Sequence, residues 1–260
     1  MLRNFTCGNR FFRVLSGLIV VSVFLFSVQN GNAQGTTDHA SDILAFSRGE
    51  MAKLITAQSG DMTSLLHGRR FQAQYPFVRG TPFWFSGVWL YGNIQTPKYV
   101  FRNIPIQYDA YKDALIYFPD SFSLDMVMLN PIQIVAFETS GMKFVYLGRG
   151  PEKDAMDQIR LSPGYFELYY QGKTLLLAKR TKALLTTSDN TETSGRFAAR
   201  TAWYIVREGA FYEVGNNRDI FSLFADQKEL VKPYWREHHI RDWTRNPDLL
   251  AKFLRYCDQL

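Results

Sequence analysis

Short apolar segments separated by turn residues dominate the chain from Phe71 to Val214. The segments are rich in β-branched and aromatic residues, and Gly, Asn, Pro or Ser interrupts them about every 8 to 12 residues, a spacing typical of all-β proteins. Gly172 and Gly209 stand between such segments, where a tight hairpin needs a positive φ angle. Consecutive hairpins predict a mainly β fold, an antiparallel meander that forms an open barrel or a sandwich.

The clearest alternation of apolar and polar residues runs from Phe122 to Met128 and is followed by Asn130 and Pro131. It predicts a half-buried strand that ends in a turn. The stretches 148–164 and 187–196 lack this alternation, so we expect them to be surface loops.

Helical patterns flank the β region. Residues 34–64 are small and polar with a weak helical periodicity, which predicts one short helix. From about residue 218 to residue 260 the pattern is helical again. Asp226 followed by Glu229 resembles a capping box, and Pro247 suits the first position of a last helix. Pro233 lies inside a helical pattern and predicts a break or kink near Lys232.

The first 33 residues have the pattern of a secretory signal peptide. The segment before residue 14 has three arginines and no acid, and residues 14–28 are apolar except for Ser and Gly. Small residues at Gly31 and Ala33 favour cleavage after Ala33. An uncleaved anchor is the alternative, but an apolar core of about 15 residues is shorter than the roughly 20 that span a bilayer. We expect export to the periplasm, to the outer membrane or to the medium, with no transmembrane span in the mature chain.

Cleavage leaves a segment at 34–64 and a single domain at 65–260, since single β domains of this length are common. The mature chain keeps 27 Lys and Arg against 24 Asp and Glu, a formal charge of +3. This small excess does not favour an anionic partner. Cys257 is the one cysteine left after cleavage. An intramolecular disulfide is therefore impossible, and we expect Cys257 to be a core residue on an apolar helix face.

Several short motifs resemble those of a family of exported, functionally uncharacterised proteins of Bacteroidota. They are Leu65-Leu66-His67-Gly68-Arg69-Arg70-Phe71, Gly80-Thr81-Pro82-Phe83, Tyr99 and Asn103, Tyr108-Asp109-Ala110-Tyr111-Lys112-Asp113-Ala114-Leu115, Gly164-Tyr165-Phe166-Glu167-Leu168, Gly172-Lys173 and Leu176-Leu177. The helical stretch from Asp226 is also similar. The resemblance implies an exported β-rich domain with C-terminal helices, and it carries no activity and no ligand.

The densest polar and aromatic cluster lies between two expected strands. It contains Tyr108, Asp109, Tyr111 and Asp113. The two carboxylates could approach a cation from one loop, but Ca²⁺ takes six to eight oxygen ligands and its loops carry a Gly at the bend. Asp side chains that accept hydrogen bonds from turn N–H groups are the simpler interpretation.

The aromatic run from Phe83 to Tyr91 is the best candidate for a ligand or partner surface. Alternation on a strand would separate Trp84 from its two phenylalanine neighbours, so one set of rings can enter the core while the other faces a cavity or a partner. We take Trp84, Trp89 and Tyr91, together with Tyr108 and Tyr111, as candidate surface residues. Core packing of these rings is the simpler interpretation.

Chemical motifs are otherwise absent from the sequence. No Gly-x-Ser-x-Gly elbow, phosphate loop or dinucleotide fingerprint occurs. We assign no catalytic residue, no metal ligand and no cofactor. The basic run from Lys179 to Lys182 lies in an expected strand, where it would protect an edge or face solvent, and export argues against nucleic acid as a partner.

These observations favour a non-catalytic structural or interaction module of the cell envelope that binds another envelope protein. A first alternative is a carrier that holds a lipid or another apolar small molecule in a β-barrel-like cavity. A second is a hydrolase that acts on exported glycans or peptides.

Overall fold

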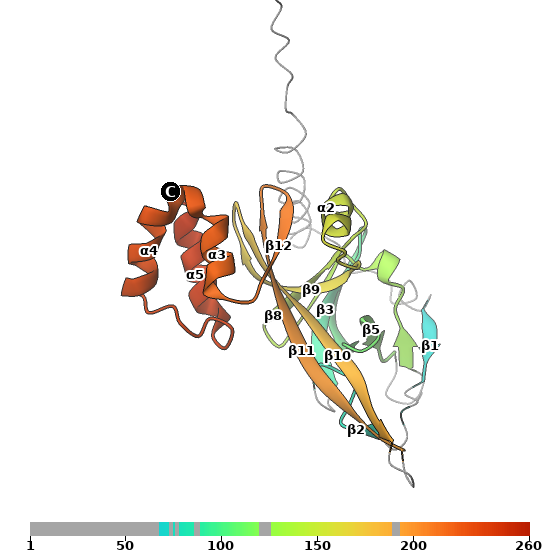
Figure 1. Cartoon of the computed structure of the whole chain (residues 1–260). Helices are drawn as coiled ribbons and strands as arrows, with labels where there is room; N and C mark the ends of the chain where they lie inside the picture. Colours follow the sequence, from blue (N-terminus) through green and yellow to red (C-terminus); the bar gives the residue numbers. More distant parts are fainter. Residues whose placement is uncertain (1–67, 73–74, 76–77, 86–88, 120–125, 189–192) are drawn as a thin grey trace, which may run out of the picture. The chain divides into compact units, whose positions relative to one another are not determined.

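The computed structural model describes residues 68–260 except 73–74, 76–77, 86–88, 120–125 and 189–192. The signal peptide expected in residues 1–33 and the helix expected in 34–64 both lie outside the described residues. The described chain is mainly β: a large, mostly antiparallel sheet that does not close into a barrel is followed by helices at the C-terminus (Figure 1). This confirms the predicted fold class.

The sheet has the spatial order β1-β6-β5-β4-β3-β7-β8-β9-β10-β11-β12, and β2 pairs with β11 in parallel. The strands are β1 (Arg69–Phe71), β2 (Val78–Arg79), β3 (Leu90–Gln95), β4 (Val100–Asp109), β5 (Ala114–Tyr117), β6 (Met126–Met128), β7 (Ala136–Thr139), β8 (Met142–Leu147), β9 (Gly164–Gln171), β10 (Leu175–Ser188), β11 (Thr193–Arg207) and β12 (Ala210–Val214). The helices are η2 (Pro131–Gln133), α2 (Glu152–Gln158), α3 (Asn217–Leu223), η3 (Ala225–Gln227), α4 (Lys228–Glu237) and α5 (Pro247–Cys257).

Successive side chains of β11 enter two different hydrophobic cores, one on each face of the second half of the sheet. Trp203 and Ile205 pack under α3, α4 and α5, in a cluster that includes Leu250, Phe253 and Leu254. Tyr204 and Val206 point to the opposite face, where they pack with Met156 of α2. Both faces of this part of the sheet are therefore covered, as the period of two along a strand requires.

A third core lies in the first half of the sheet and consists mainly of rings. Phe137 and Phe144 stack with their centroids 4.6 Å apart, and Tyr108 and Tyr165 meet them at larger angles. All four side chains are fully buried. Aromatic packing fills this region and holds β4, β7, β8 and β9 together.

Strands β10 and β11 form a two-stranded arm that extends past their neighbours (Figure 1). The two strands pair from Leu175 opposite Val206 to Ser188 opposite Thr193, whereas β9 pairs with β10 as far as Ala178 and β12 pairs with β11 from Trp203. We call residues 179–188 and 193–202 the arm. The short β2 pairs with the arm near its tip.

Three local predictions were wrong, and a fourth was wrong in part. Helix α2 lies in the stretch 148–164, and β10 and β11 enter the stretch 187–196 from both sides, so neither is simply a loop. Of the break or kink expected near Lys232, the break is absent: Pro233 lies inside α4, where Val231 and Trp235 on either side are buried in the helical core. The capping box is formed by Asn216 and Asp219 at α3, not by Asp226 and Glu229.

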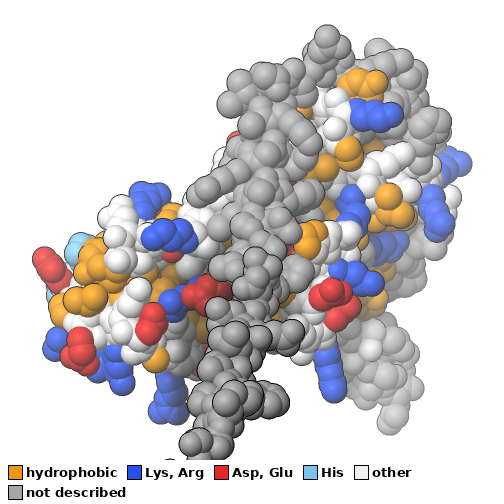
Figure 2. All heavy atoms as spheres, turned by 90° about the horizontal axis from the view of Figure 1, so that it is seen from above, with side chains coloured by type: hydrophobic (Ala, Val, Ile, Leu, Met, Phe, Trp, Pro, Cys, Tyr) orange, Lys and Arg blue, Asp and Glu red, His pale blue; other side chains and the backbone are white. Residues whose placement is uncertain are grey.

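Cys257 is buried on α5, as predicted, and burial raises the pKa of its thiol to about 12. Pro247 begins α5, also as predicted. Within the described residues, no helix combines the length and the apolar character needed to cross a bilayer. Seen from above, basic side chains are scattered among hydrophobic ones over the visible face instead of forming one broad patch (Figure 2).

Candidate functional site

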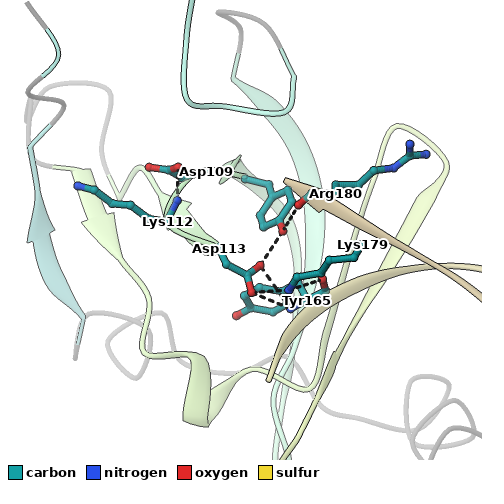
Figure 3. Close-up of polar contacts among 7 residues, drawn as sticks. Asp109, Lys112, Asp113, Tyr165, Lys179 and Arg180 are labelled. Carbon is teal, nitrogen blue, oxygen red and sulfur yellow. Dashed lines mark hydrogen bonds and ion pairs between the residues drawn. The ribbon is translucent and has the colours of Figure 1, made fainter. Parts of the chain in front are cut away.

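The turn between β4 and β5 packs against the base of the arm and carries both predicted acids, which bond to different parts of the chain (Figure 3). Asp109 is the last residue of β4, and its Oδ1 accepts hydrogen bonds from the N–H groups of Tyr111 and Lys112, each at 2.9 Å. This is the local bonding that favours Asp in turns. Asp109 is fully buried, and burial raises the pKa of its carboxyl group.

The carboxylates of Asp113 and Asp109 have no partner in common. Asp113 points to β9 and β10 (Figure 3). Its Oδ2 lies 2.6 Å from Nζ of Lys179, and the Tyr108 hydroxyl donates to its Oδ1 at 2.6 Å. The Tyr165 N–H also donates to this carboxylate, at 3.3 Å. Asp113 has a φ of 53°, a left-handed conformation that Asp tolerates better than most residues.

Lys179 completes this cluster from β10. Its ammonium group donates to Asp113 and to the Tyr165 carbonyl at 3.1 Å, and burial lowers its pKa. A Cβ atom at Gly164 would collide with Asp113 Oδ2 and Lys179 Nζ. Glycine at the start of β9 therefore allows the ion pair to lie directly against the backbone.

A second cluster surrounds Arg180, the next residue of the arm. Its Nε donates to Glu167 at 2.6 Å, and its two terminal nitrogens donate to Thr201 at 2.7 Å and to the Tyr169 hydroxyl at 2.6 Å. The guanidinium carbon lies 4.8 Å from the centroid of the Trp84 ring. The pKa of the Tyr169 hydroxyl is raised to about 12, and burial is the largest cause.

Lys182 ties the arm to the chain segment that precedes β3. Its Nζ donates to the Thr81 carbonyl at 2.8 Å and to the Phe83 carbonyl, and its backbone N–H donates to the Ala110 carbonyl at 3.0 Å. The expectation that the basic run protects an edge or faces solvent was therefore wrong. The three cations of this run all bind other parts of the chain, because partly buried cations need acceptors.

The candidate aromatic residues do not form one surface. Tyr108 is buried in the ring core, Trp84 is half-buried under Arg180, and Trp89 stacks on Phe118 at 5.2 Å. Tyr91 is 65% exposed on β3. Tyr111, 41% exposed, belongs to a separate group with Phe197 of the arm, at 5.6 Å between ring centroids.

Described residues line hollows at two places on the sheet, and residues of the run from Phe83 to Tyr91 line neither of these. The larger has a volume of about 370 Å³ and lies at the sheet edge between Gly68 and Ile132. The smaller holds about 10 Å³ and lies beside Glu138 and Lys143. Among the described residues, no three His, Cys, Asp or Glu side chains are grouped closely enough to hold a metal ion.

Sequence reasoning found the acidic turn but missed Lys179, Arg180 and Glu167 as its neighbours. A signal was available: charged residues in the middle of apolar strands are rarely buried without a partner. The partner of Asp113 lies 66 residues further along the chain, so the pairing itself could not be deduced. Lys179 with Asp113 and Lys182 with the carbonyls of Thr81 and Phe83 fasten the turn and the segment at residues 81–84 to the arm. Asp109 takes no part in this: its Oδ1 bonds within its own turn, and its Oδ2 has no hydrogen-bond partner among the described residues.

Comparisons with known proteins do not identify this chain: no protein-family model, no curated protein and no solved structure matches it.

Proposed function

We propose that this protein is an exported cell-envelope module that acts by binding a partner protein, without catalysis, and that the arm is its contact surface. The observation that carries the proposal is the contrast between the two ends of the arm. At the base, Lys179, Arg180 and Lys182 bind Asp113, Glu167 and backbone carbonyls of the same chain. Beyond the base, the exposed residues include Leu185, Arg196 and Arg200, whereas Leu184 and Phe197 are half-buried.

The exposed part of the arm combines charge with apolar surface. Arg196 and Arg200 are exposed on β11, and Leu185 on β10 is 43% exposed, directly opposite Arg196. A leucine at the end of a projecting arm is poorly placed to contribute to the core. Arginine is enriched at protein interfaces relative to the rest of a protein surface.

The contacts at the base supply the rigidity that such a surface needs. Three ionic or charge-assisted groups fix the arm to β9, to the β4–β5 turn and to the segment before β3. A preorganised surface loses less conformational entropy when it binds. The arrangement thus supports a role in recognition, and the signal-peptide pattern supports the cell envelope as its location.

Site-specific photo-crosslinking in the cells that produce the protein tests this proposal. A photoreactive residue replaces Leu185 in one variant and Leu230, which is 55% exposed on α4, in the matched control. We expect discrete covalent adducts from position 185 and only background from position 230, with the protein recovered from the envelope or the medium. Equal background at both positions, or recovery from the cytoplasm, would contradict the proposal.

A further inference from the structure

The outer edge of β11 has a gap between its two neighbours. Strand β2 pairs with Gly195 and Arg196, and β12 begins to pair at Trp203. In the part of the chain that the structure describes, no strand pairs with residues 197–202 on this edge. Six residues of extended chain span about 20 Å, which is the length of an ordinary strand.

The hydrogen-bond pattern of the arm identifies the backbone groups that face this gap. Lys182 donates its N–H to Ala110, away from β11, so Lys182 and its partner Ala199 form a non-hydrogen-bonded pair. In such a pair both residues direct their N–H and C=O groups outward. Ala199, and Thr201 two residues later, therefore present donors and acceptors to the outer edge of β11.

The side chains beside the gap give its two faces different character. Even-numbered residues of β11 carry the exposed Arg196 and Arg200, and β2 places the exposed Arg79 directly opposite Arg196. Described residues of this face of the arm and of β2 include no acid. The other face carries Phe197, whose ring meets Tyr75 at 5.1 Å between centroids.

We propose that an extended, acidic segment of a partner protein binds by adding a strand to β11 at residues 197–202. The inference rests on the proposed function and names the chemistry of the partner. Backbone bonds to Ala199 and Thr201 would supply affinity, as in other cases of strand addition. An acidic side chain next to Arg200 and an apolar one next to Phe197 would supply specificity.

Charge favours such a partner over a second copy of this chain. Pairing two β11 edges would bring arginine-bearing faces together, and like charges on neighbouring strands are unfavourable. Cationic side chains on an open edge are a known protection against such self-association. The carboxylates of an acidic strand would instead form ion pairs with the arginines that disfavour a second copy.

The test uses two labelled, end-blocked synthetic peptides of about seven residues, one alternating glutamate with valine and the other lysine with valine. Fluorescence anisotropy with the full exported chain should show binding of the glutamate peptide and much weaker binding of the lysine peptide. Hydrogen exchange should show new protection of the amides of Ala199 and Thr201 when the glutamate peptide is added. Absence of binding, or protection elsewhere, overturns the inference.

Two variants locate the binding at this edge. Ala199→Pro removes one outward N–H and leaves the ladder to β10 intact, so the glutamate peptide should bind about tenfold more weakly. Ala199→Val keeps the N–H and should bind like the parent chain. Equal binding by both variants overturns the inference.

A charge reversal remains informative if Ala199→Pro does not fold. Arg200→Glu should bind the glutamate peptide about threefold more weakly and the lysine peptide about threefold more tightly than the parent chain. An unchanged preference contradicts the inference. If crosslinks form at position 185 while these peptides and variants show no effect, strand addition fails and the proposed function stands.

Discussion

The ion pair between Lys179 and Asp113 offers the sharpest test of how the arm is fastened. Lys179→Met keeps most of the side-chain volume but removes the charge that faces Asp113. The two side chains are 12% and 25% exposed, and their charged atoms are 2.6 Å apart. Loss of one partner typically costs about 3–5 kcal/mol for a buried pair and less than about 1 kcal/mol between exposed partners. Because Asp113 is partly exposed, we expect a loss of about 2–3 kcal/mol.

A double-mutant cycle separates this interaction from other effects of the substitutions. In Lys179→Met with Asp113→Asn, no unpaired charge remains, and the Asn oxygen still accepts from Tyr108 or from the Tyr165 N–H. The double variant should therefore lose clearly less free energy of unfolding than the sum of the two single variants. The coupling should be about 1.5 kcal/mol or more.

Urea denaturation of the four proteins gives the free energies, and thermal melting provides a second measurement. For a domain of this size, each kcal/mol lowers Tm by about 2–4 °C, so Lys179→Met should melt about 5–10 °C lower. Lys173→Met, at an exposed residue of the turn before β10, is the matched control and should change Tm little. Additive losses in the cycle would refute the argument that the pair acts as a unit.

Three further predictions follow from buried groups. Burial raises the pKa of Tyr108 and of Tyr165 above 10, so the folded state holds both phenols neutral and loses stability as pH rises above about 10. The buried Tyr165 hydroxyl has no hydrogen-bond partner among the described residues, so Tyr165→Phe should keep or raise Tm at pH 7 and flatten the alkaline decline, whereas a large loss at pH 7 would contradict this. The Cys257 thiol, with its pKa raised to about 12, should resist iodoacetamide at pH 8 until urea unfolds the chain, and rapid native alkylation would disprove its burial. Gly164→Ala should lower Tm, because its Cβ would displace Asp113 from its lysine, and a Tm equal to that of the parent would show that the turn shifts freely.

Local signals explain which parts of the fold could be predicted from the sequence. Glycine in the turns before β10 and before β12 marks hairpins between strands that are neighbours in the chain, and both hairpins are present. The expected positive φ occurs at Gly209 but not at Gly172. The parallel pairing of β2 with β11 joins Val78 to Gly195, and no local pattern encodes such a distant contact. Pro233 shows the opposite case, in which a strong local signal for a helix break is overridden by the packing of the residues beside it.

The same limit applies to the candidate site. Asp109 could be interpreted from its own turn, because its partners are the next few backbone N–H groups. Asp113 could not, because Lys179 reaches it from another strand. The open edge of β11 was also beyond prediction, since it depends on where two unrelated strands, β2 and β12, stop pairing.

The bonds from Lys182 to Thr81 and Phe83 join positions 101 and 99 residues apart. Contacts between residues so far apart in the sequence form late, because a long loop must close before they contribute. They also lower the folding rate. Because a chain is synthesised N-terminus first, Phe83 and Trp84 emerge long before the arm against which they pack. During that interval these rings would be open to aggregation or to a chaperone, so the speed of arm formation would set how much of the protein reaches its native state.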